Sequence, residues 1–474
     1  MGVLAHKKKL VGAISAVYAL YRYLGLNTNP VVQLLKLTVR AIMSKLTVPL
    51  ARFLQGLVSN SPKLPTRPSN ITAPFIEWVL KKQGFQNTIR SLKIKPFDAG
   101  KTSKAVRIYI EYNEQQSYER ISRPSSLVCK MSREDIEGRV FNLVAGLYRE
   151  AEFYSVYGNS CLLTVPTVYY SNVSMFSYDF LIIMEDLAPA TVIAPPDILR
   201  TKYTWDTIDD SWSVPIETVE KCIQQLVPFH SKFLGKRKEL ATQEWLISPF
   251  KDGRKSLKLY NFYFKTSWKK SKAMAAKGRW ISTPWPHDFV DTVDRFTRDY
   301  YDLMLADETL WPRGMNHGDF HGMNILEKDD RLVVLDFQIT GVGPALMDVG
   351  YFLATALSSE DRRTHEERLV RMHYDGLIEG NNFDDPRIYP FELYYERYKL
   401  MGYYKVVLLV ICAATIMADG KEEDAYMVPW IHHRLAKFTA DHGDPLLNWR
   451  KSTERRRKLL KQYPDLAKRH EYSV

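Results

Sequence analysis

Three polar residues, Asp319, Asn324 and Asp336, have the types and spacing that phosphoryl transfer requires. Asp319 and Asn324 lie five residues apart in the segment NHGDFHGMNIL, and Asp336 follows the apolar run LVVL. Phosphoryl transfer needs a carboxylate that orients the attacking hydroxyl and accepts its proton. It also needs an amide oxygen and a second carboxylate that hold Mg²⁺ against the phosphates. The three side chains together supply all of these parts.

The same segment resembles the aminoglycoside phosphotransferase and choline kinase superfamily, and in particular its ecdysteroid-kinase-like branch. The resemblance rests on the string H-G-D-x-x-x-x-N, on Asp336-Phe337-Gln338 and on the following segment Gly343–Asp348. An isolated H-G-D would be a loop with a capping aspartate, whereas the combined string at this spacing indicates a kinase. The resemblance implies that Asp319 is the catalytic base, that Asn324 and Asp336 bind the metal, and that the cofactors are ATP and Mg²⁺.

The resemblance also suggests roles for three neighbouring residues. His317 is expected to brace the catalytic loop by hydrogen bonds, and Asp348 is expected to be structural rather than catalytic. His321 has no role in the pattern, so we expect it to be a loop histidine whose hydrogen bonds are satisfied locally.

A lysine and a glutamate upstream match the phosphate-binding pair of such kinases. Lys130 lies in the apolar strand-like run LVCKM, and Glu150 lies in the helix-like YREAEFY. By the resemblance, Lys130 neutralises the α and β phosphates and Glu150 holds it in place. Glu152 is the rival partner, and a surface ion pair or no contact at all is the non-functional alternative.

Two further stretches are candidates for binding the nucleotide. The segment DAGKTS between two strand-like runs holds Gly100, Thr102 and Ser103, where backbone N–H groups and hydroxyls can reach phosphate. Taken alone it would be an ordinary hairpin turn. Glu185 and Leu187 follow the strand-like run FLII, in the place of the hinge that contacts adenine through its backbone.

Two departures from protein kinases favour a small-molecule substrate with a hydroxyl group over a protein substrate. Gln338 replaces the glycine of D-F-G, and only a few residues separate Asp336 from Gly343–Asp348, which leaves no room for a long activation segment. Two alternatives stay open: a membrane-associated pseudokinase or scaffold with weak activity, and a choline or ethanolamine kinase proper. The sequence does not name the substrate.

The order of the elements indicates an α+β, bilobal protein-kinase-like fold. A short helix over 74–83 precedes five strand-like runs with one helix-like segment, 137–157, among them, and the chain from about 215 onward is mostly helical. We therefore predict a small lobe over 73–190, with an antiparallel sheet and one helix, and a larger, mostly helical lobe over 191–448. The expected strands are 91–97, 105–112, 127–131, 167–170 and 180–184, and a short strand, 332–335, is expected in the large lobe.

The first 76 residues contain ten Lys or Arg and no Asp or Glu. Residues 1–58 are predicted to form a basic amphipathic helical extension that binds a membrane surface, and 59–72 a proline-rich linker. The alternatives are a mitochondrial presequence and an extension that folds back on the kinase. No apolar run reaches the ~18 residues that span a bilayer, and 406–417 is expected to be a buried helix. The expected location is cytoplasmic, in contact with a membrane.

The net charge of +12 is concentrated in three segments, which argues against a uniformly basic nucleic-acid binder. Besides the N-terminal segment, residues 251–279 carry a net +9 and the tail 449–474 a net +6, so the remainder is acidic. We interpret 251–279 as a solvated basic face with its aromatic residues turned inward, and the tail as a solvated helix. Four scattered cysteines without a C-x-x-C pair argue against a zinc site and a disulfide framework.

Overall fold

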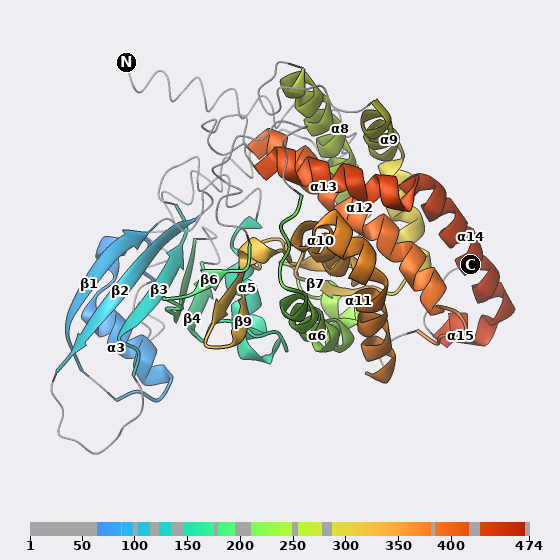
Figure 1. Cartoon of the computed structure of the whole chain (residues 1–474). Helices are drawn as coiled ribbons and strands as arrows, with labels where there is room; N and C mark the ends of the chain where they lie inside the picture. Colours follow the sequence, from blue (N-terminus) through green and yellow to red (C-terminus); the bar gives the residue numbers. More distant parts are fainter. Residues whose placement is uncertain are drawn as a thin grey trace, which may run out of the picture. The chain divides into compact units, whose positions relative to one another are not determined.

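The computed structural model describes residues 64–86, 88–97, 103–113, 123–133, 146–174, 179–194, 210–248, 255–276, 287–380, 384–416 and 427–469. These residues form two compact units (Figure 1). The smaller unit holds the described residues up to Gly158 together with Pro166–Leu187. The larger unit holds Asn159–Val165 and the described residues from Ala188 onward.

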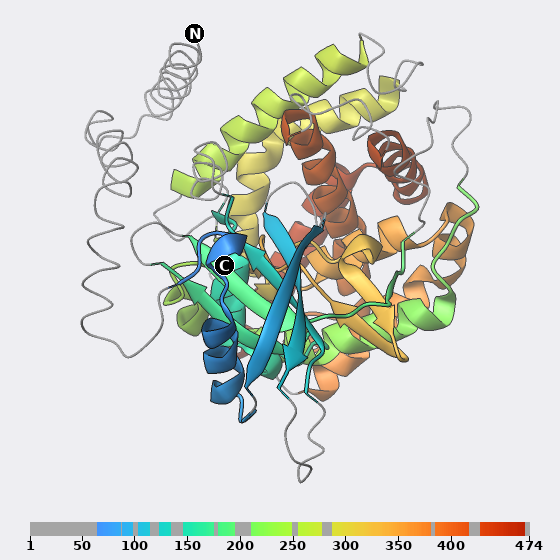
Figure 2. The same cartoon turned by 90° about the vertical axis from the view of Figure 1, so that its left-hand side faces the viewer.

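The smaller unit is built on a five-stranded antiparallel sheet with the strand order β1-β2-β3-β5-β4 (Figures 1 and 2). Two α-helices, α3 and α5, and the 3₁₀ helices η1 and η3 accompany it; η3 leads into the larger unit. The elements are η1 (Pro68–Asn70), α3 (Ala73–Lys82), β1 (Ile89–Phe97), β2 (Lys104–Tyr112), β3 (Ser126–Met131), α5 (Arg149–Val156), η3 (Gly158–Ser160), β4 (Val168–Val173) and β5 (Phe180–Glu185).

Helix α3 covers one face of this sheet. Thr72 caps its first turn by accepting a hydrogen bond from the backbone N–H of Phe75, and Gly84, at φ +90°, follows its end. Phe75 and Val79 are buried in one apolar cluster with Cys129 of β3. Because successive side chains of a strand point to opposite faces, Lys130 lies on the face opposite α3.

The larger unit contains the remaining helices and two small sheets, one of strands β6, β8 and β9 and one of β7 and β10. Its first elements are β6 (Thr191–Val192), α6 (Ile216–Phe233), α7 (Arg237–Ala241), α8 (Lys255–Ala275), α9 (His287–Leu310), β7 (Gly314–Asn316), η4 (Gly322–Asn324), β8 (Ile325–Lys328), β9 (Arg331–Val334) and β10 (Gly341–Gly343). They are followed by α10 (Leu346–Ala356), α11 (Ser359–Glu379), α12 (Phe391–Ile416), α13 (Met427–His442), α14 (Pro445–Gln462) and α15 (Pro464–Arg469).

Helix α10 lies at the centre of the larger unit, and nearly all of its residues are buried. It packs closely on α12, because a Cβ added to Gly350 would lie only 2.5 Å from the backbone nitrogen of Gly402. The two glycines therefore allow the two helix backbones to touch. This contact fixes the helix that begins within the segment Gly343–Asp348 and has Asp348 in its first turn.

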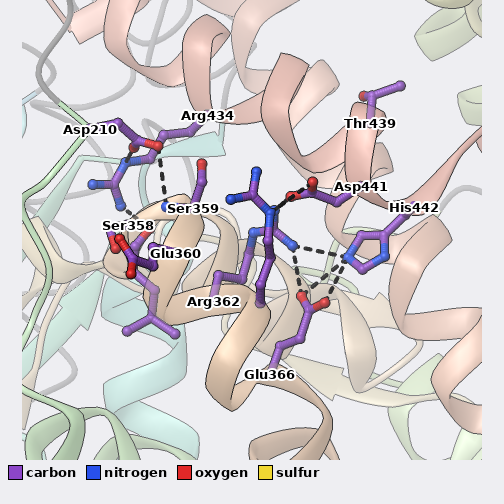
Figure 3. Close-up of polar contacts among 12 residues, drawn as sticks. Asp210, Ser358, Ser359, Glu360, Arg362, Glu366, Arg434, Thr439, Asp441 and His442 are labelled. Carbon is purple, nitrogen blue, oxygen red and sulfur yellow. Dashed lines mark hydrogen bonds and ion pairs between the residues drawn. The ribbon is translucent and has the colours of Figure 1, made fainter.

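A buried charged network joins α11 to α13 (Figure 3). Arg362 and Glu366, one turn apart on α11, form an ion pair with 2.9 Å between Nη1 and Oε2. The Nε2 atom of His442 on α13 lies 3.1 Å from the carboxylate of Glu366, and Asp441 pairs with Arg362. The side chains of Arg362 and Glu366 are at most 5 % exposed. A second, separate group on α13 is centred on Arg434, which pairs with Asp210 and donates to backbone carbonyls.

The predicted fold class is confirmed: an antiparallel five-stranded sheet with helices is combined with a larger, mostly helical unit. Each of the five predicted strands has a counterpart with bounds within three residues. The predicted helix over 137–157 is described only from residue 146, and its α-helical part begins at Arg149. The N-terminal extension, residues 59–63 of the linker and residues 98–102 around Gly100 lie outside the described residues.

The two basic segments differ in their packing. Helix α8 exposes Lys258, Lys265 and Lys269 and buries Phe264 and Trp268, which fits a solvated basic face with inward aromatic residues. Helix α14 begins before the predicted tail does. Its Arg456 is fully buried, pairing with Asp384 and donating to the backbone carbonyl oxygens of Leu310 and Ile388. The tail helix is thus packed against the larger unit through a buried cation.

Residues predicted to form a buried helix over 406–417 lie in α12 up to Ile416. None of the helices in the described part of the chain is both long and apolar enough to cross a bilayer.

Candidate active site

The loop with Asp319 connects β7 to η4, and its path depends on Gly318. Strand β7 pairs with β10, which places Asn316 opposite Gly341. Gly318 has φ +84°, and a Cβ added to it would lie 2.3 Å from the backbone oxygen of Ile339. Both the left-handed backbone and the close approach exclude any residue with a side chain. The glycine of the H-G-D string is therefore required by geometry.

His317 braces this loop from inside, as its position in the string led us to expect. Its Nε2 lies 2.9 Å from the backbone oxygen of Leu335, and its Nδ1 accepts a hydrogen bond from the backbone N–H of Asp319 at 3.1 Å. Because a carbonyl only accepts, the imidazole carries its proton on Nε2. Burial lowers the pKa of His317, so the ring stays neutral. The ring also packs on Phe337, with 4.5 Å between centroids.

Asp348, in the first turn of α10, anchors the loop through two of its backbone N–H groups. Its Oδ2 accepts from the backbone N–H of His317 at 2.8 Å, and its Oδ1 accepts from that of Gly318 at 2.9 Å. The Nε2 atom of His230 on α6 lies 3.1 Å from the same Oδ2. Burial alone would raise the pKa of Asp348, but the hydrogen bonds from His230 and from the backbone N–H of Gly318 hold it below its ordinary value. The carboxylate is therefore ionised.

Asp319 and Asn324 are brought together by two hydrogen bonds. The Nδ2 atom of Asn324 donates to the backbone oxygen of Asp319 at 3.0 Å and to its carboxylate Oδ2 at 3.3 Å. His321 lies beside them: its Nδ1 accepts from the backbone N–H of Met323, and its Nε2 is 3.6 Å from Oδ2 of Asp319. His321 is thus bonded within the loop, as we expected.

Asp336 lies two residues after the end of strand β9 and has a left-handed backbone at φ +67°. The backbone N–H of Leu335 donates to the backbone oxygen of Asn324 at 2.8 Å, which ties the end of this strand to η4. The negative charges of Asp319 and Asp336 both act to raise the pKa of His317, although burial outweighs them. An amide oxygen and a carboxylate are hard ligands that suit Mg²⁺, which takes one or two carboxylates and completes its shell with phosphate oxygens and water. The donor set fits a magnesium ion.

Lys130 and Glu150 form a buried ion pair in the smaller unit. The Nζ atom of Lys130 on β3 lies 2.5 Å from Oε2 of Glu150, in the first turn of α5. Their side chains are 10 % and 2 % exposed. The ion pair that the sequence suggested is present, and Glu150 rather than Glu152 is the partner. Burial raises the pKa of Glu152, which means that its surroundings disfavour the ionised carboxylate.

The remaining candidates in the smaller unit are placed less fully. Ser103 is buried just before β2, whereas Gly100 and Thr102 lie outside the described residues. Glu185 ends β5, and its backbone N–H donates to Thr167. Leu187 is buried two residues further on. These positions match a strand end followed by a short connection.

Two buried histidines of the larger unit were missed in the sequence. His230 of α6 and His373 of α11 are at most 1 % exposed and lie beside Asp348 and each other. Each is isolated on its helix: His230 lies 118 residues before Asp348, and His373 lies 25 residues after it. Nothing in their local sequence distinguishes them from core residues.

Comparison with solved structures gives matches of low identity. A GDP complex of wild-type aminoglycoside 2'-phosphotransferase-IIIa is 11 % identical with a TM-score of 0.44, covering 79 % of this chain and 100 % of that one. Choline kinase from Cryptosporidium parvum Iowa II is 8 % identical with a TM-score of 0.39, covering 78 % and 90 %. A thermostable mutant of aminoglycoside phosphotransferase APH(4)-Ia with ADP and hygromycin B is 14 % identical with a TM-score of 0.36, covering 77 % and 98 %.

A search of curated proteins found no match. The sequence profile described as the ecdysteroid kinase-like family matches residues 100–382. The matched range includes Lys130, Glu150 and the loop from His317 to Asn324, and it spans more than half of the chain. The protein therefore belongs to the ecdysteroid kinase-like family, a family of small-molecule kinases with a protein-kinase-like α+β fold.

Proposed function

We propose that this protein transfers the γ-phosphate of ATP, with Mg²⁺, to a hydroxyl group of a small molecule. The observation that carries the proposal is the pair of hydrogen bonds from Nδ2 of Asn324 to Asp319, which holds the two side chains together on one loop. Phosphoryl transfer depends on such positioning more than on covalent chemistry by the protein.

In the proposed reaction, Asp319 is the catalytic base. Its carboxylate orients the substrate hydroxyl and accepts its proton as the hydroxyl oxygen attacks the γ-phosphorus. The bond between the γ-phosphorus and the bridging oxygen breaks, and ADP leaves with that oxygen. Asn324 and Asp336 would hold Mg²⁺, which neutralises the charge on the phosphates. The hydrogen bond from Asn324 Nδ2 keeps the Asp319 carboxylate in one orientation and turns the amide oxygen of Asn324 away from it.

The smaller unit supplies the proposed nucleotide contacts. Lys130 is proposed to bind the α and β phosphates, with Glu150 holding its ammonium group in place. Ser103, with Gly100 and Thr102, is proposed to cover the phosphates, and the backbone around Glu185 and Leu187 to contact the adenine. The desolvation free energy of a buried ion pair can exceed the attraction between its charges, so such a pair contributes little to stability. The presence of this pair on the sheet face opposite α3 therefore supports a functional role.

The proposal is tested with the purified full chain, Mg²⁺ and ATP. ATP consumption is measured against a panel of sterols, amino-alcohols, sugars and aminoglycosides, and phosphorylated products are identified by mass spectrometry. We expect consumption that depends on one hydroxyl class and a phosphate ester of that compound. ATP binding without consumption in any arm would favour the pseudokinase alternative, and activity confined to choline or ethanolamine would make the protein a kinase of that class.

A further inference from the structure

A buried chain of hydrogen bonds connects three helices to the anchor of the catalytic loop. The hydroxyl of Tyr394 on α12 lies 2.8 Å from Nδ1 of His373 on α11. The Nε2 atom of His373 lies 2.9 Å from Nδ1 of His230 on α6, and Nε2 of His230 lies 3.1 Å from Oδ2 of Asp348. All four side chains are buried.

With the His230 ring neutral, the direction of every bond in this chain follows from its last member. The carboxylate of Asp348 already accepts two backbone N–H groups, so His230 must carry a proton on Nε2 and donate it. In a neutral His230 ring, Nδ1 then has a lone pair and accepts from Nε2–H of His373. His373 in turn accepts at Nδ1 from the hydroxyl of Tyr394. All three donors therefore point toward Asp348.

The neutral state of the second ring agrees with this arrangement. Burial lowers the pKa of His373 well below its ordinary value. A neutral imidazole has one donor and one acceptor nitrogen, so His373 can pass on the direction of the chain in only one way. Without the Nε2–H of His373, Nδ1 of His230 would face no donor from α11, and the His230 ring would lose one of the two hydrogen bonds that hold its orientation.

We propose that His373 and Tyr394 are positioning residues of the active site. They hold the ring of His230 in the orientation in which its Nε2–H donates to Asp348, and Asp348 in turn holds the backbone N–H groups of His317 and Gly318, directly before Asp319. Chains of hydrogen bonds that polarise one another in a dry interior are stronger than isolated bonds. His373, two hydrogen bonds away from Asp348, thus contributes to the order of this loop.

The effect on turnover rests on the proposed function, but the effect on loop order does not. Two variants at one position separate hydrogen bonding from packing. In His373→Gln the side-chain amide nitrogen can take the place of Nε2 and donate to His230, whereas His373→Leu fills a similar volume with no donor. Tyr394→Phe removes only the hydroxyl at the far end of the chain.

The first measurement is amide hydrogen exchange of the full chain, followed in the peptide that contains His317 and Gly318. We expect faster exchange in His373→Leu and near wild-type exchange in His373→Gln. Nitrogen NMR of ¹⁵N-histidine-labelled protein should show an unprotonated Nδ1 on His230 in the wild type and a changed signal in the leucine variant. Equal exchange in both His373 variants, whether fast or slow, would overturn the proposal.

The second measurement is the steady-state rate with the substrate found in the activity screen. His373→Leu should lower kcat about 10- to 100-fold, as loss of an outer-shell partner typically does, while KM for ATP stays within about twofold. His373→Gln should recover most of the loss. If the leucine variant does not fold, Tyr394→Phe decides: unchanged ¹⁵N signals of both histidines in that variant would contradict the chain. If the wild type shows no kinase activity, only the proposed function fails, because exchange and NMR still test the positioning role.

Discussion

Asn324 donates a hydrogen bond to the carboxylate of Asp319 at 3.3 Å and a second one to its backbone oxygen at 3.0 Å. The proposed base and the proposed metal ligand are thus coupled, so a substitution of either residue removes a hydrogen bond that positions the other. His317 is hydrogen-bonded to the backbone N–H of Asp319 and to the carbonyl of Leu335. It therefore links the loop of Asp319 and Asn324 to the strand end that precedes Asp336.

Substitution of Asp336 should abolish the magnesium dependence of nucleotide binding. We choose Asp336→Asn, because the left-handed backbone at φ +67° tolerates asparagine better than other residues. The change removes one negative charge from the proposed metal site. ATP affinity is measured by calorimetry with and without Mg²⁺.

A matched control for that variant is Asp329→Asn, an exposed aspartate in the turn before β9 that also has a positive φ. It should bind ATP with the wild-type dependence on Mg²⁺. If Asp336→Asn shows the same dependence as this control, Asp336 is not a metal ligand.

Lys130→Met should weaken ATP binding and also destabilise the smaller unit. Breaking a buried ion pair by removing one partner leaves an uncompensated charge and costs about 3–5 kcal/mol. The double variant Lys130→Met with Glu150→Gln should therefore be less destabilised than Lys130→Met alone, although both should bind ATP weakly. Lys93→Met, at an exposed position of β1, serves as the control. Additive losses of stability in the double variant would argue against the coupling of the two residues.

Gly318→Ala should inactivate the protein and loosen the catalytic loop. The new Cβ would meet the backbone oxygen of Ile339 at 2.3 Å, so the loop must move. Gly84→Ala is the matched control, since Gly84 has a similar φ of +90° but no atom within 4 Å of the added Cβ. The control isolates the backbone strain, which is about 1–2 kcal/mol. Equal activity of the two variants would show that the close approach does not matter.

Glu366→Gln should lower the stability of the larger unit in a pH-dependent way. Burial would raise the pKa of Glu366, but the hydrogen bonds and charges of His442 and Arg362 lower it to about 2. With the folded pKa below the ordinary value, the carboxylate stabilises the fold above pH ~4.5, by at most about 3 kcal/mol, and this contribution is lost as the pH falls toward ~2.

The measurement is the melting temperature of wild type and Glu366→Gln at several pH values. The gap between the two should be largest near neutral pH and should close between about pH 4.5 and 2, because the wild-type carboxylate becomes protonated there. Glu367→Gln, an exposed neighbour on the same helix, should show no such gap. A gap that is independent of pH would mean that the charge of Glu366 does not contribute.

Local sequence patterns were sufficient to predict much of the smaller unit and of the catalytic loop. The contact of Asp319 with Asn324 spans five residues and is built by one loop, so their spacing alone indicates it. The ion pair of Lys130 with Glu150 joins a strand and the next helix, and alternation along the strand shows which side of the sheet the lysine faces.

Contacts between distant helices were not predictable in this way. His230 and Asp348 are 118 residues apart and His230 and His373 are 143 apart, and each histidine looks like any core residue of its helix. The sequence around Arg456 is strongly basic, which is typical of a solvent-exposed helix. Arg456 is nevertheless buried, because α9, α14 and the segment before α12 meet around it. Strands β7 and β10 have only three residues each, too few for a periodic signal.

The central claim is that Asp319 is the base of a phosphoryl transfer, and it is tested most directly by turnover and nucleotide binding of Asp319→Asn in parallel. The substitution keeps the size of the side chain and removes its ability to accept the proton of the substrate. We predict that kcat falls by roughly 10²–10⁴ while the affinity for ATP with Mg²⁺ stays close to that of the wild type. Turnover near the wild-type rate would contradict the account.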